Sequence, residues 1–554
     1  MMRRREFAQL AAAPLLAQSG SPRPNILWLS CEDSSPMLGC YGDPHAITPT
    51  LDAFAQESVR YTRAYTVAGV CAPSRSGIIS GMYPTTLGSM HMRSMVKLPP
   101  EIRCFPEYLR EAGYYCTNNA KTDYNFAVPK AAWDESSAKA HWRNRPAGRP
   151  FFAVFNQEVT HESRYPRRGA EHEADVKRLK PGERQDPAKL TTLPPYYPDT
   201  PESRRDWANV YECLTAMDYW VADRLAEIRE AGLENDTIVF FWGDHGVGLP
   251  RAKRSLYESG TRVPLMIRIP AKFRTAGQGQ PGSVDPQLVS MIDLAPTVLK
   301  LAGVAAPKHF QGRAFLGPGL SPARPYVHGA RDRMDERYDR VRMVRDSRYR
   351  YLRNYDPDRP YYQPMRTPDQ GPTMKEIRRL KAAGELPAAA LLFAGDRKPP
   401  EELYDVEADP HEIRNLARDP KYAPVLKRMR AEHERWLRDT LDLGGIPEPD
   451  LEELGRAAGT RYAILRTPTT RTRRPVIGPR IAKAKAAKDV SALERELRHE
   501  NEFARLMAAQ ALDELGEVAL PALESLERAR EDANDYVRRV ANHAVAGLKA
   551  TIKK

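Results

Sequence analysis

Two short apolar runs, one near the start and one near the middle of the chain, constrain its fold most strongly. Residues 25–29 and residues 237–242 consist mostly of large apolar side chains. Continuous apolar runs of this length are typical of strands that are covered on both faces. Helical patterns lie between them, at residues 50–58 and 207–232. This alternation predicts an α/β fold with a mostly parallel central sheet and helices on both of its faces.

Acidic residues follow both runs closely. Glu32 and Asp33 come after the first run, and Asp244 and His245 come after the second. In sheets of this kind, ligands collect where strands end and the chain turns into a loop. The two pairs lie about two hundred residues apart in the sequence, and we expect the fold to bring them together around one hard cation.

The first 21 residues have the pattern of a targeting segment. Arg3, Arg4 and Arg5 precede Phe7 and a short apolar run that reaches Ala17. This pattern predicts a twin-arginine-like signal peptide at residues 1–21 and an exported protein, periplasmic or extracellular. A disordered basic N-terminus of a cytoplasmic protein is the alternative. Since no apolar stretch reaches the roughly 20 residues that span a bilayer, no transmembrane anchor is expected.

The cysteine content and the net charge exclude some classes of protein. Six cysteines in 554 residues are too few for a disulfide scaffold, and no pair has the close spacing of a zinc site. The net charge of +13 favours anionic partners, but basic side chains that are spread over a surface usually only keep the protein solvated. We expect no nucleic-acid partner. Five cysteines have apolar or aromatic neighbours and are predicted to be buried thiols: Cys31, Cys40, Cys104, Cys116 and Cys213.

Pattern and length together indicate several regions. The length implies two to four domains, and the predicted catalytic domain covers residues 22–325. A smaller C-terminal α+β subdomain with an antiparallel sheet is predicted over residues 326–445. Its expected parts are paired strands at 341–345 and 348–352, a long loop or insertion at 355–400, and a closing helix at 431–439.

The end of the chain differs from the rest. Residues 446–489 are predicted to be an extended basic linker, because residues 461–488 carry nine Lys or Arg and no acid; a site for a polyanion is the alternative. Residues 490–554 form a predicted helical tail, in which 504–512 and 537–545 align at a 33-residue offset and resemble HEAT-type repeats. So few repeats cannot bury a core alone, so we expect the tail to pack on the enzyme body or on another protein. Ordinary Ala-rich helices are the alternative.

The stretch Cys71-Ala72-Pro73-Ser74-Arg75 resembles the signature of the type I sulfatases. In that family a maturation enzyme oxidises the cysteine to Cα-formylglycine, whose hydrate is the nucleophile. The alternative for Cys71 is a buried free thiol at the start of a helix. Further segments resemble landmarks of the same family, in the same order, between residues 22 and 440, and imply an alkaline-phosphatase-like fold. They lie at residues 23–27, 48–52, 71–81, 243–246, 253–264, 293–297 and 402–405.

The resemblance implies a role for each candidate residue. Arg75 is expected to stabilise the hydrate of the modified Cys71, and Lys121 and Lys253 to bind the sulfate. His161 or Lys253 is expected to protonate the leaving oxygen, and Asp123 could be the base that expels sulfate from the nucleophile. The implied Ca²⁺ site, with Mg²⁺ as the alternative, is made by Glu32, Asp33, Asp244, His245 and the modified Cys71.

Three positions depart from the family pattern. Glu32 stands where the family commonly has Asp, and Asp123 stands where many relatives have His. His245 replaces the more frequent Asn, and imidazole is a softer ligand than an amide oxygen, so the metal preference is open.

The substrate expectation comes from one further segment. Residues 194–201 and the following helix with Met217 and Asp218 look like the corresponding part of heparan N-sulfatases and their bacterial relatives. This resemblance implies a sulfated glycan as substrate, with an O-sulfate or an N-sulfate removed. Two alternatives stay open: a phosphoester or phosphonate monoester hydrolase of the same superfamily, and a glycan-binding adaptor without catalysis if Cys71 is unmodified.

Overall fold

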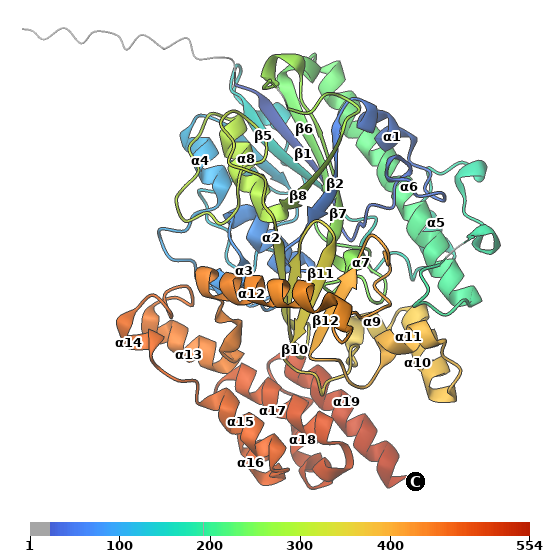
Figure 1. Cartoon of the computed structure of the whole chain (residues 1–554), viewed down its shortest axis with the longest axis vertical. Coiled ribbons are helices and arrows are strands. Elements are labelled where there is room, and N and C mark those ends of the chain that lie inside the picture. The colour runs from blue at the N-terminus through green and yellow to red at the C-terminus, as the bar shows by residue number, and fades with distance from the viewer. Residues whose placement is uncertain (1–22, 192, 277, 554) are drawn as a thin grey trace, which may run out of the picture.

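The computed structural model describes residues 23–191, 193–276 and 278–553 (Figure 1). A body built around two sheets carries a group of helices at its C-terminal end. The predicted signal peptide lies outside the described residues. Within them, no helix is both long and apolar enough to cross a membrane.

The central sheet has the predicted α/β character. Within the described residues it contains eight strands, and all neighbouring pairs are parallel except the two that β7 makes with β6 and β2. In sheet order the strands are β4 (Glu135–Ser136), β3 (Tyr115–Asn119), β5 (Phe151–Gln157), β1 (Asn25–Cys31), β6 (Thr237–Gly243), β7 (Arg262–Arg268), β2 (Val59–Tyr65) and β8 (Val284–Ser290).

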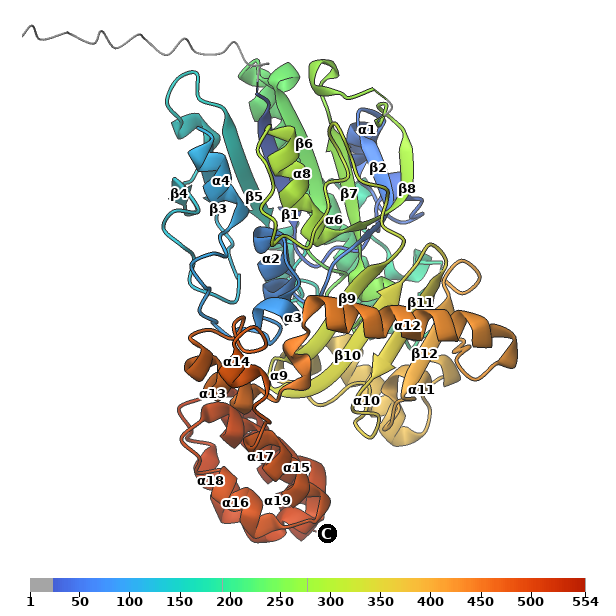
Figure 2. The same ribbon diagram turned by 60° about the vertical axis from the view of Figure 1, so that its left-hand side comes forward.

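Side chains of β1 point alternately to the two faces of this sheet, and each face has its own apolar core. Leu27 and Leu29 belong to the core under α1 (Pro49–Gln56) and α6 (Pro201–Glu230), whereas Ile26 and Trp28 belong to the opposite core. The opposite core includes α4 (Phe105–Glu111) and α8 (Leu294–Leu301) (Figure 2). The continuous apolar runs therefore reflect burial on both faces, as predicted.

A second, antiparallel sheet packs beside the first. The predicted strand pair is present as β10 (Arg337–Arg345) and β11 (Tyr349–Asn354), flanked by β9 (Val327–Met334) and β12 (Glu401–Asp405). The predicted closing helix is the C-terminal part of α12 (Ala423–Thr440). Met429 of this helix packs with Val344, Tyr351 and Leu403 of the sheet.

Two segments are more ordered than predicted. The expected long loop at 355–400 contains α9 (Arg366–Asp369), α10 (Pro372–Ala383) and α11 (Ala388–Ala394). The loop prediction is wrong because Met374 and Ile377 of α10 recur at helical spacing and join the core that contains α6; the alternative, an insertion, stays a prediction.

The expectation of an extended linker at 446–489 is also wrong. This segment contains α13 (Glu448–Ala458), α14 (Pro468–Arg471) and α15 (Ile477–Ala486). The carboxylate of Asp450 in α13 accepts hydrogen bonds from the backbone amides of Val476, Ile477 and Gly478, so an acid outside the basic run starts α15.

The tail forms a small helical layer whose core also includes Ile477, Ile481 and Ala484 of α15, so the tail does not bury this core alone. Its helices are α16 (Val490–Glu496), α17 (Glu502–Leu515), α18 (Leu523–Ala529) and α19 (Asp535–Ile552). Ala508, Ala511, Ala541 and Ala544, the residues that align at the 33-residue offset, all lie in this core. The other α-helices of the described residues are α2 (Cys71–Ser80), α3 (Pro84–Leu87), α5 (Ala170–Asp175) and α7 (Glu258–Thr261).

The tail packs against the second sheet of the same chain through polar contacts. Arg337 Nη1 lies 2.7 Å from Asp513 Oδ2, and Arg359 Nε lies 2.9 Å from Glu514 Oε1. The backbone amide of Tyr338 donates to Gln510 Oε1 at 3.1 Å. Packing on the enzyme body is one of the two outcomes expected for a tail of this length.

Candidate active site

Four neighbouring parallel strands end at one edge of the central sheet and deliver the predicted site residues there. Cys31 at the end of β1 pairs with Gln157 of β5 on one side and with Gly243 of β6 on the other. The loops that follow the strands are therefore adjacent. They carry Lys121 and Asp123 after β3, His161 after β5, Glu32 and Asp33 after β1, and Asp244 and His245 after β6.

Cys71 is the first residue of α2, and every residue of this helix is buried. Ser74 Oγ donates a hydrogen bond to the backbone oxygen of Asp244 at 2.7 Å, which fixes the first turn of the helix against the end of β6. The Cys71 side chain is 2% exposed, and burial raises the pKa of its thiol well above the usual value. At neutral pH this thiol is protonated, so it is a poor nucleophile as it stands.

Arg75 joins the ends of three of the four strands. Its Nε donates to Asp244 Oδ2 at 3.1 Å, its Nη2 to Glu32 Oε1 at 3.1 Å and its Nη1 to Asn156 Oδ1 at 2.9 Å. Asn156 was not identified from the sequence. It lies near the end of β5, and its Oδ1 also accepts from Ser30 Oγ at 2.6 Å. A polar residue directly after the apolar run at 151–155 was the available signal.

Both predicted lysines reach the acidic groups. Lys121 Nζ lies 2.6 Å from Glu32 Oε1, and Lys253 Nζ lies 2.8 Å from Asp33 Oδ2 and 3.0 Å from Glu162 Oε1. Burial opposes the charge of each lysine, but the neighbouring carboxylates outweigh it and raise both pKa values. Both ammonium groups are therefore charged at neutral pH.

Glu162 and Arg254 are functional candidates that sequence reasoning missed, although each is adjacent to a predicted residue. Arg254 Nη1 lies 2.7 Å from Glu162 Oε2, and its Nε lies 2.7 Å from Asp335 Oδ2. Glu162 also donates its backbone amide to Asp33 Oδ2 at 2.7 Å. Together with Lys253, these groups form a buried chain of ion pairs from Asp33 to Asp335.

His161 and Asp123 lie at the rim of the cluster. His161 Nε2 is 3.9 Å from Glu32 Oε2, and its side chain is 28% exposed. Burial and the charge of Lys253 lower the pKa of His161 to about 4, so the imidazole is neutral at pH 7 in the free protein. Asp123 Oδ2 lies 4.0 Å from Lys121 Nζ. The structure thus brings all of the predicted residues into one region.

The acidic cluster fits a divalent cation. Asp33, Asp244 and His245 each offer one ligand atom within 4.8 Å of the others, and Glu32, Asp33 and His161 form a second such group. His245 Nε2 is buried, lies 3.2 Å from Asp33 Oδ1 and makes no hydrogen bond to any described residue. Burial and the charge of Asp244 raise the pKa of Glu32 to about 7 despite Arg75 and Lys121. A cation among these carboxylates would offset the repulsion between their negative charges.

Comparison with known proteins places this site in a family. Residues 24–128 and 115–304 match the profile described as Sulfatase. The chain belongs to the sulfatase family. It is 42% identical over 465 residues to an ulvan-active sulfatase of Formosa agariphila, an alignment that covers 77% of either chain.

Two more distant proteins extend this comparison. This sulfatase is 28% identical to the human N-sulphoglucosamine sulphohydrolase over 76% of its own length and 90% of the human protein. A solved structure described as a complex with its substrate D-glucosamine-2-N,6-O-disulfate is 18% identical and superposes with a TM-score of 0.55 over 76% of this chain and 98% of that one. The superposition confirms the predicted fold.

Proposed function

We propose that this sulfatase removes an O-sulfate or an N-sulfate from a sulfated glycan, with Cys71 oxidised to formylglycine as its nucleophile. The observation that carries the proposal is the position of Cys71, at the start of a buried helix among Lys121, Lys253 and the acidic cluster. The names of two relatives support the substrate class, since one is ulvan-active and the other acts on N-sulphoglucosamine. Export and a formylglycine-generating maturation enzyme belong to the same proposal.

The thiol itself is unsuited to the reaction because burial keeps it protonated. Oxidation to formylglycine supplies an aldehyde hydrate with two hydroxyls, one to attack sulfur and one to release the sulfate afterwards. Arg75 holds Glu32 and Asp244 in place beside the first turn of α2. Lys121 and Lys253 provide fixed positive charge for the sulfate oxygens.

The proton for the leaving oxygen is assigned to His161. Lys253 is held by two carboxylates that raise its pKa, so it keeps its proton. His161 is neutral in the free protein, but an incoming sulfate anion raises its pKa by direct charge interaction. Substrate binding would therefore load His161 with the proton that the leaving oxygen needs. Asp123 is assigned as the base that assists sulfate release.

The proposed cation is Ca²⁺, with Mg²⁺ as the alternative. Glu32, Asp33, Asp244 and His245 would hold it together with the modified Cys71, and it would supply positive charge to the sulfate oxygens. Carboxylate oxygens suit either cation, whereas the imidazole of His245 suits softer metals better.

This donor set predicts a change of metal preference in His245→Asn. The variant is expected to bind Ca²⁺ at least as tightly as the parent protein but Mn²⁺ and Zn²⁺ about tenfold more weakly, because an amide oxygen replaces the ring nitrogen. Calorimetric titration of metal-free protein measures these affinities. Asp33→Asn is the matched variant and is expected to weaken all of these cations. Unchanged Mn²⁺ and Zn²⁺ affinity in His245→Asn would remove His245 from the proposed ligands.

The reaction class is tested by comparing matched aryl esters. The proposal predicts kcat/KM for 4-nitrophenyl sulfate at least about tenfold above that for 4-nitrophenyl phosphate, because the lysines and the cation are arranged for a monoanionic sulfate ester. Release of sulfate from ulvan and heparan-sulfate oligosaccharides, measured by ion chromatography, tests the glycan class. Faster phosphate-ester cleavage would favour the phosphoester or phosphonate hydrolase alternative instead.

A further inference from the structure

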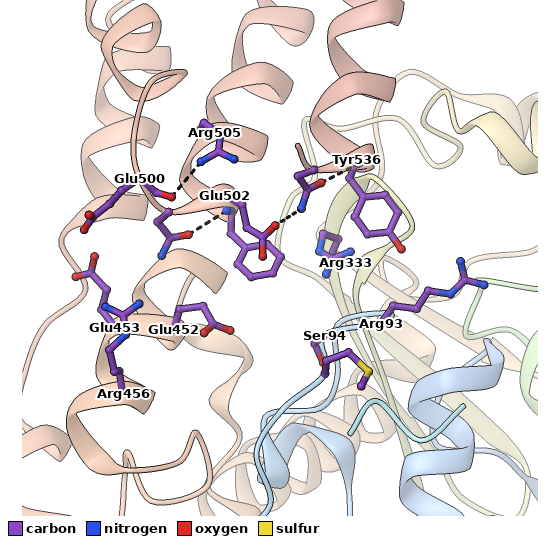
Figure 3. A pocket seen from close by; sticks show the side chains of 14 residues that line it. Arg93, Ser94, Arg333, Glu452, Glu453, Arg456, Glu500, Glu502, Arg505 and Tyr536 are labelled. Atoms are coloured by element: carbon purple, nitrogen blue, oxygen red, sulfur yellow. Dashed lines mark hydrogen bonds between the residues drawn. The ribbon is translucent and has the colours of Figure 1, made fainter. Parts of the chain in front are cut away.

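A large cavity lies between the helical tail and the catalytic body. Its volume is about 780 Å³, within the range of small-molecule binding sites. One wall comes from the body and carries Arg93 and Arg333, and the opposite walls come from α13 and from the N-terminal ends of α17 and α19 (Figure 3). The tail therefore completes a cavity that the body alone would leave open.

The cavity adjoins the proposed nucleophile through one short segment. Met92 packs with Cys71 and Met334 in a small apolar cluster, and Arg93, the next residue, lines the cavity. The backbone of Arg93 is left-handed, with φ of 57°, and its amide donates to Asn125 Oδ1 at 2.7 Å. Asp123, one of the predicted site residues, is among the charged groups that act on Arg93. One segment thus has the nucleophile on one side and the cavity on the other.

Among the arginines that line the cavity, Arg333 and Arg505 have carboxylate partners, whereas Arg93 and Arg456 have none in the described part of the chain. Arg333 pairs with Glu448 at 2.6 Å, and Arg505 pairs with Asp532 at 2.7 Å. Arg93 is exposed, and its guanidinium forms no hydrogen bond or ion pair with any described residue. The Tyr536 hydroxyl likewise has no hydrogen-bond partner in the described part of the chain, and Figure 3 shows it pointing toward Arg93. Body and tail therefore both present uncommitted polar groups to the same space, Arg93 from the body and Tyr536 from the tail among them.

The lining indicates the chemistry of the occupant. Glu453, Arg456 and Glu500 add further polar groups of both signs, and the wall offers little apolar surface beyond Met95 and Phe503. Sugar hydroxyls both donate and accept hydrogen bonds and therefore match such a lining, whereas an acyl chain or an apolar peptide side chain does not. The unpaired Arg93 suits a sulfate or carboxylate substituent.

We propose that this cavity binds the sugar that adjoins the sulfated sugar in the glycan chain, with Arg93 paired to an anionic substituent and Tyr536 bonded to a hydroxyl. The proposal rests on the glycan sulfatase function given above and assigns the helical tail a direct part in substrate binding. A small aryl sulfate occupies only the site at Cys71, whereas an oligosaccharide occupies that site and the cavity.

Kinetics on the two kinds of substrate test this assignment. Arg93→Ala and Tyr536→Phe are expected to lower kcat/KM for sulfated ulvan or heparan-sulfate oligosaccharides at least about tenfold more than for 4-nitrophenyl sulfate, as expected for loss of a hydrogen bond to a charged or polar group. Arg474→Ala, an exposed arginine outside the cavity, is the matched control and should leave the ratio of the two unchanged. Equal losses on both substrates, or none, would overturn the proposal.

A binding measurement separates this proposal from the reaction itself. In full-length Cys71→Ala protein, affinity for tetrasaccharides should exceed that for sulfated monosaccharides, and adding Arg93→Ala should reduce the difference at least about tenfold. If the parent protein with Cys71 intact cleaves no sulfate ester, loss of this difference on adding Arg93→Ala would still support the subsite while it rejects the reaction. Equal affinity for both ligand lengths in Cys71→Ala would reject the subsite, whatever the protein cleaves.

Discussion

Replacing Cys71 by Ala is expected to abolish sulfate-ester hydrolysis, with kcat lowered on the order of 10⁴-fold or more, as when other covalent nucleophiles are removed. The physical reason is that none of the neighbouring side chains can supply the attacking group. Arg75, Lys121 and Lys253 are cations held by carboxylates, and His161 lies at the rim of the cluster. Initial rates on 4-nitrophenyl sulfate, with protein co-produced with a formylglycine-generating enzyme, measure the effect.

The matched control is Cys116→Ala. Cys116 is equally buried but lies near the start of β3, in the apolar core that contains α4, so its replacement should leave kcat within about threefold. Aldehyde-specific labelling followed by peptide mapping should place one reactive aldehyde at position 71 of the active protein. An active protein without that aldehyde would instead mean that Cys71 is a structural thiol. An unlabelled and inactive protein would favour the adaptor alternative.

Replacing Arg75 by Met is expected to reduce both activity and stability. Arg75 is 3% exposed and its guanidinium pairs with Glu32 and Asp244, so its removal leaves two buried carboxylates without their shared partner. Breaking a buried pair in this way typically costs about 3–5 kcal/mol of unfolding free energy. We also expect kcat/KM to fall about 10²–10³-fold because the carboxylates and the first turn of α2 lose their common anchor.

Two further variants make this second experiment decisive. Arg75→Lys keeps the charge but cannot reach Asp244, Glu32 and Asn156 together, so it should fall between the parent protein and Arg75→Met. Arg474→Met removes an exposed arginine and should change neither quantity. Urea denaturation with and without Ca²⁺ measures the stability. An unfolding free energy of Arg75→Met within about 1 kcal/mol of the parent value would contradict the buried network.

Local sequence pattern was sufficient to predict the sheet edge. The apolar runs at β1 and β6 are long enough to indicate strands buried on both faces, and strand adjacency then brings Glu32 beside Asp244. Lys121 and Lys253 were identified as site residues only through the family resemblance. Their ion pairs with Glu32 and Asp33 agree with that assignment.

Other features depend on contacts between distant segments, which no local pattern contains. Asn156, Glu162 and Arg254 have partners 81 to 92 residues away in the sequence. The basic segment looked extended because it contains no acid, yet Asp450, 26 residues before Val476, starts its longest helix. The cavity at Arg93 exists only because the tail packs against the body. The sequence of the tail and the sequence of the body therefore cannot predict it separately.

The enclosure of α2 bears on how an active molecule can arise. A modifying enzyme must bring its own catalytic groups against Cys71 Sγ, but the folded chain buries Cys71 and the other residues of α2, the helix that it begins. Under the proposed function, we therefore expect oxidation to take place before this segment folds, and a molecule that folds first to keep its thiol. The active fraction of a preparation would then depend on the relative rates of oxidation and folding.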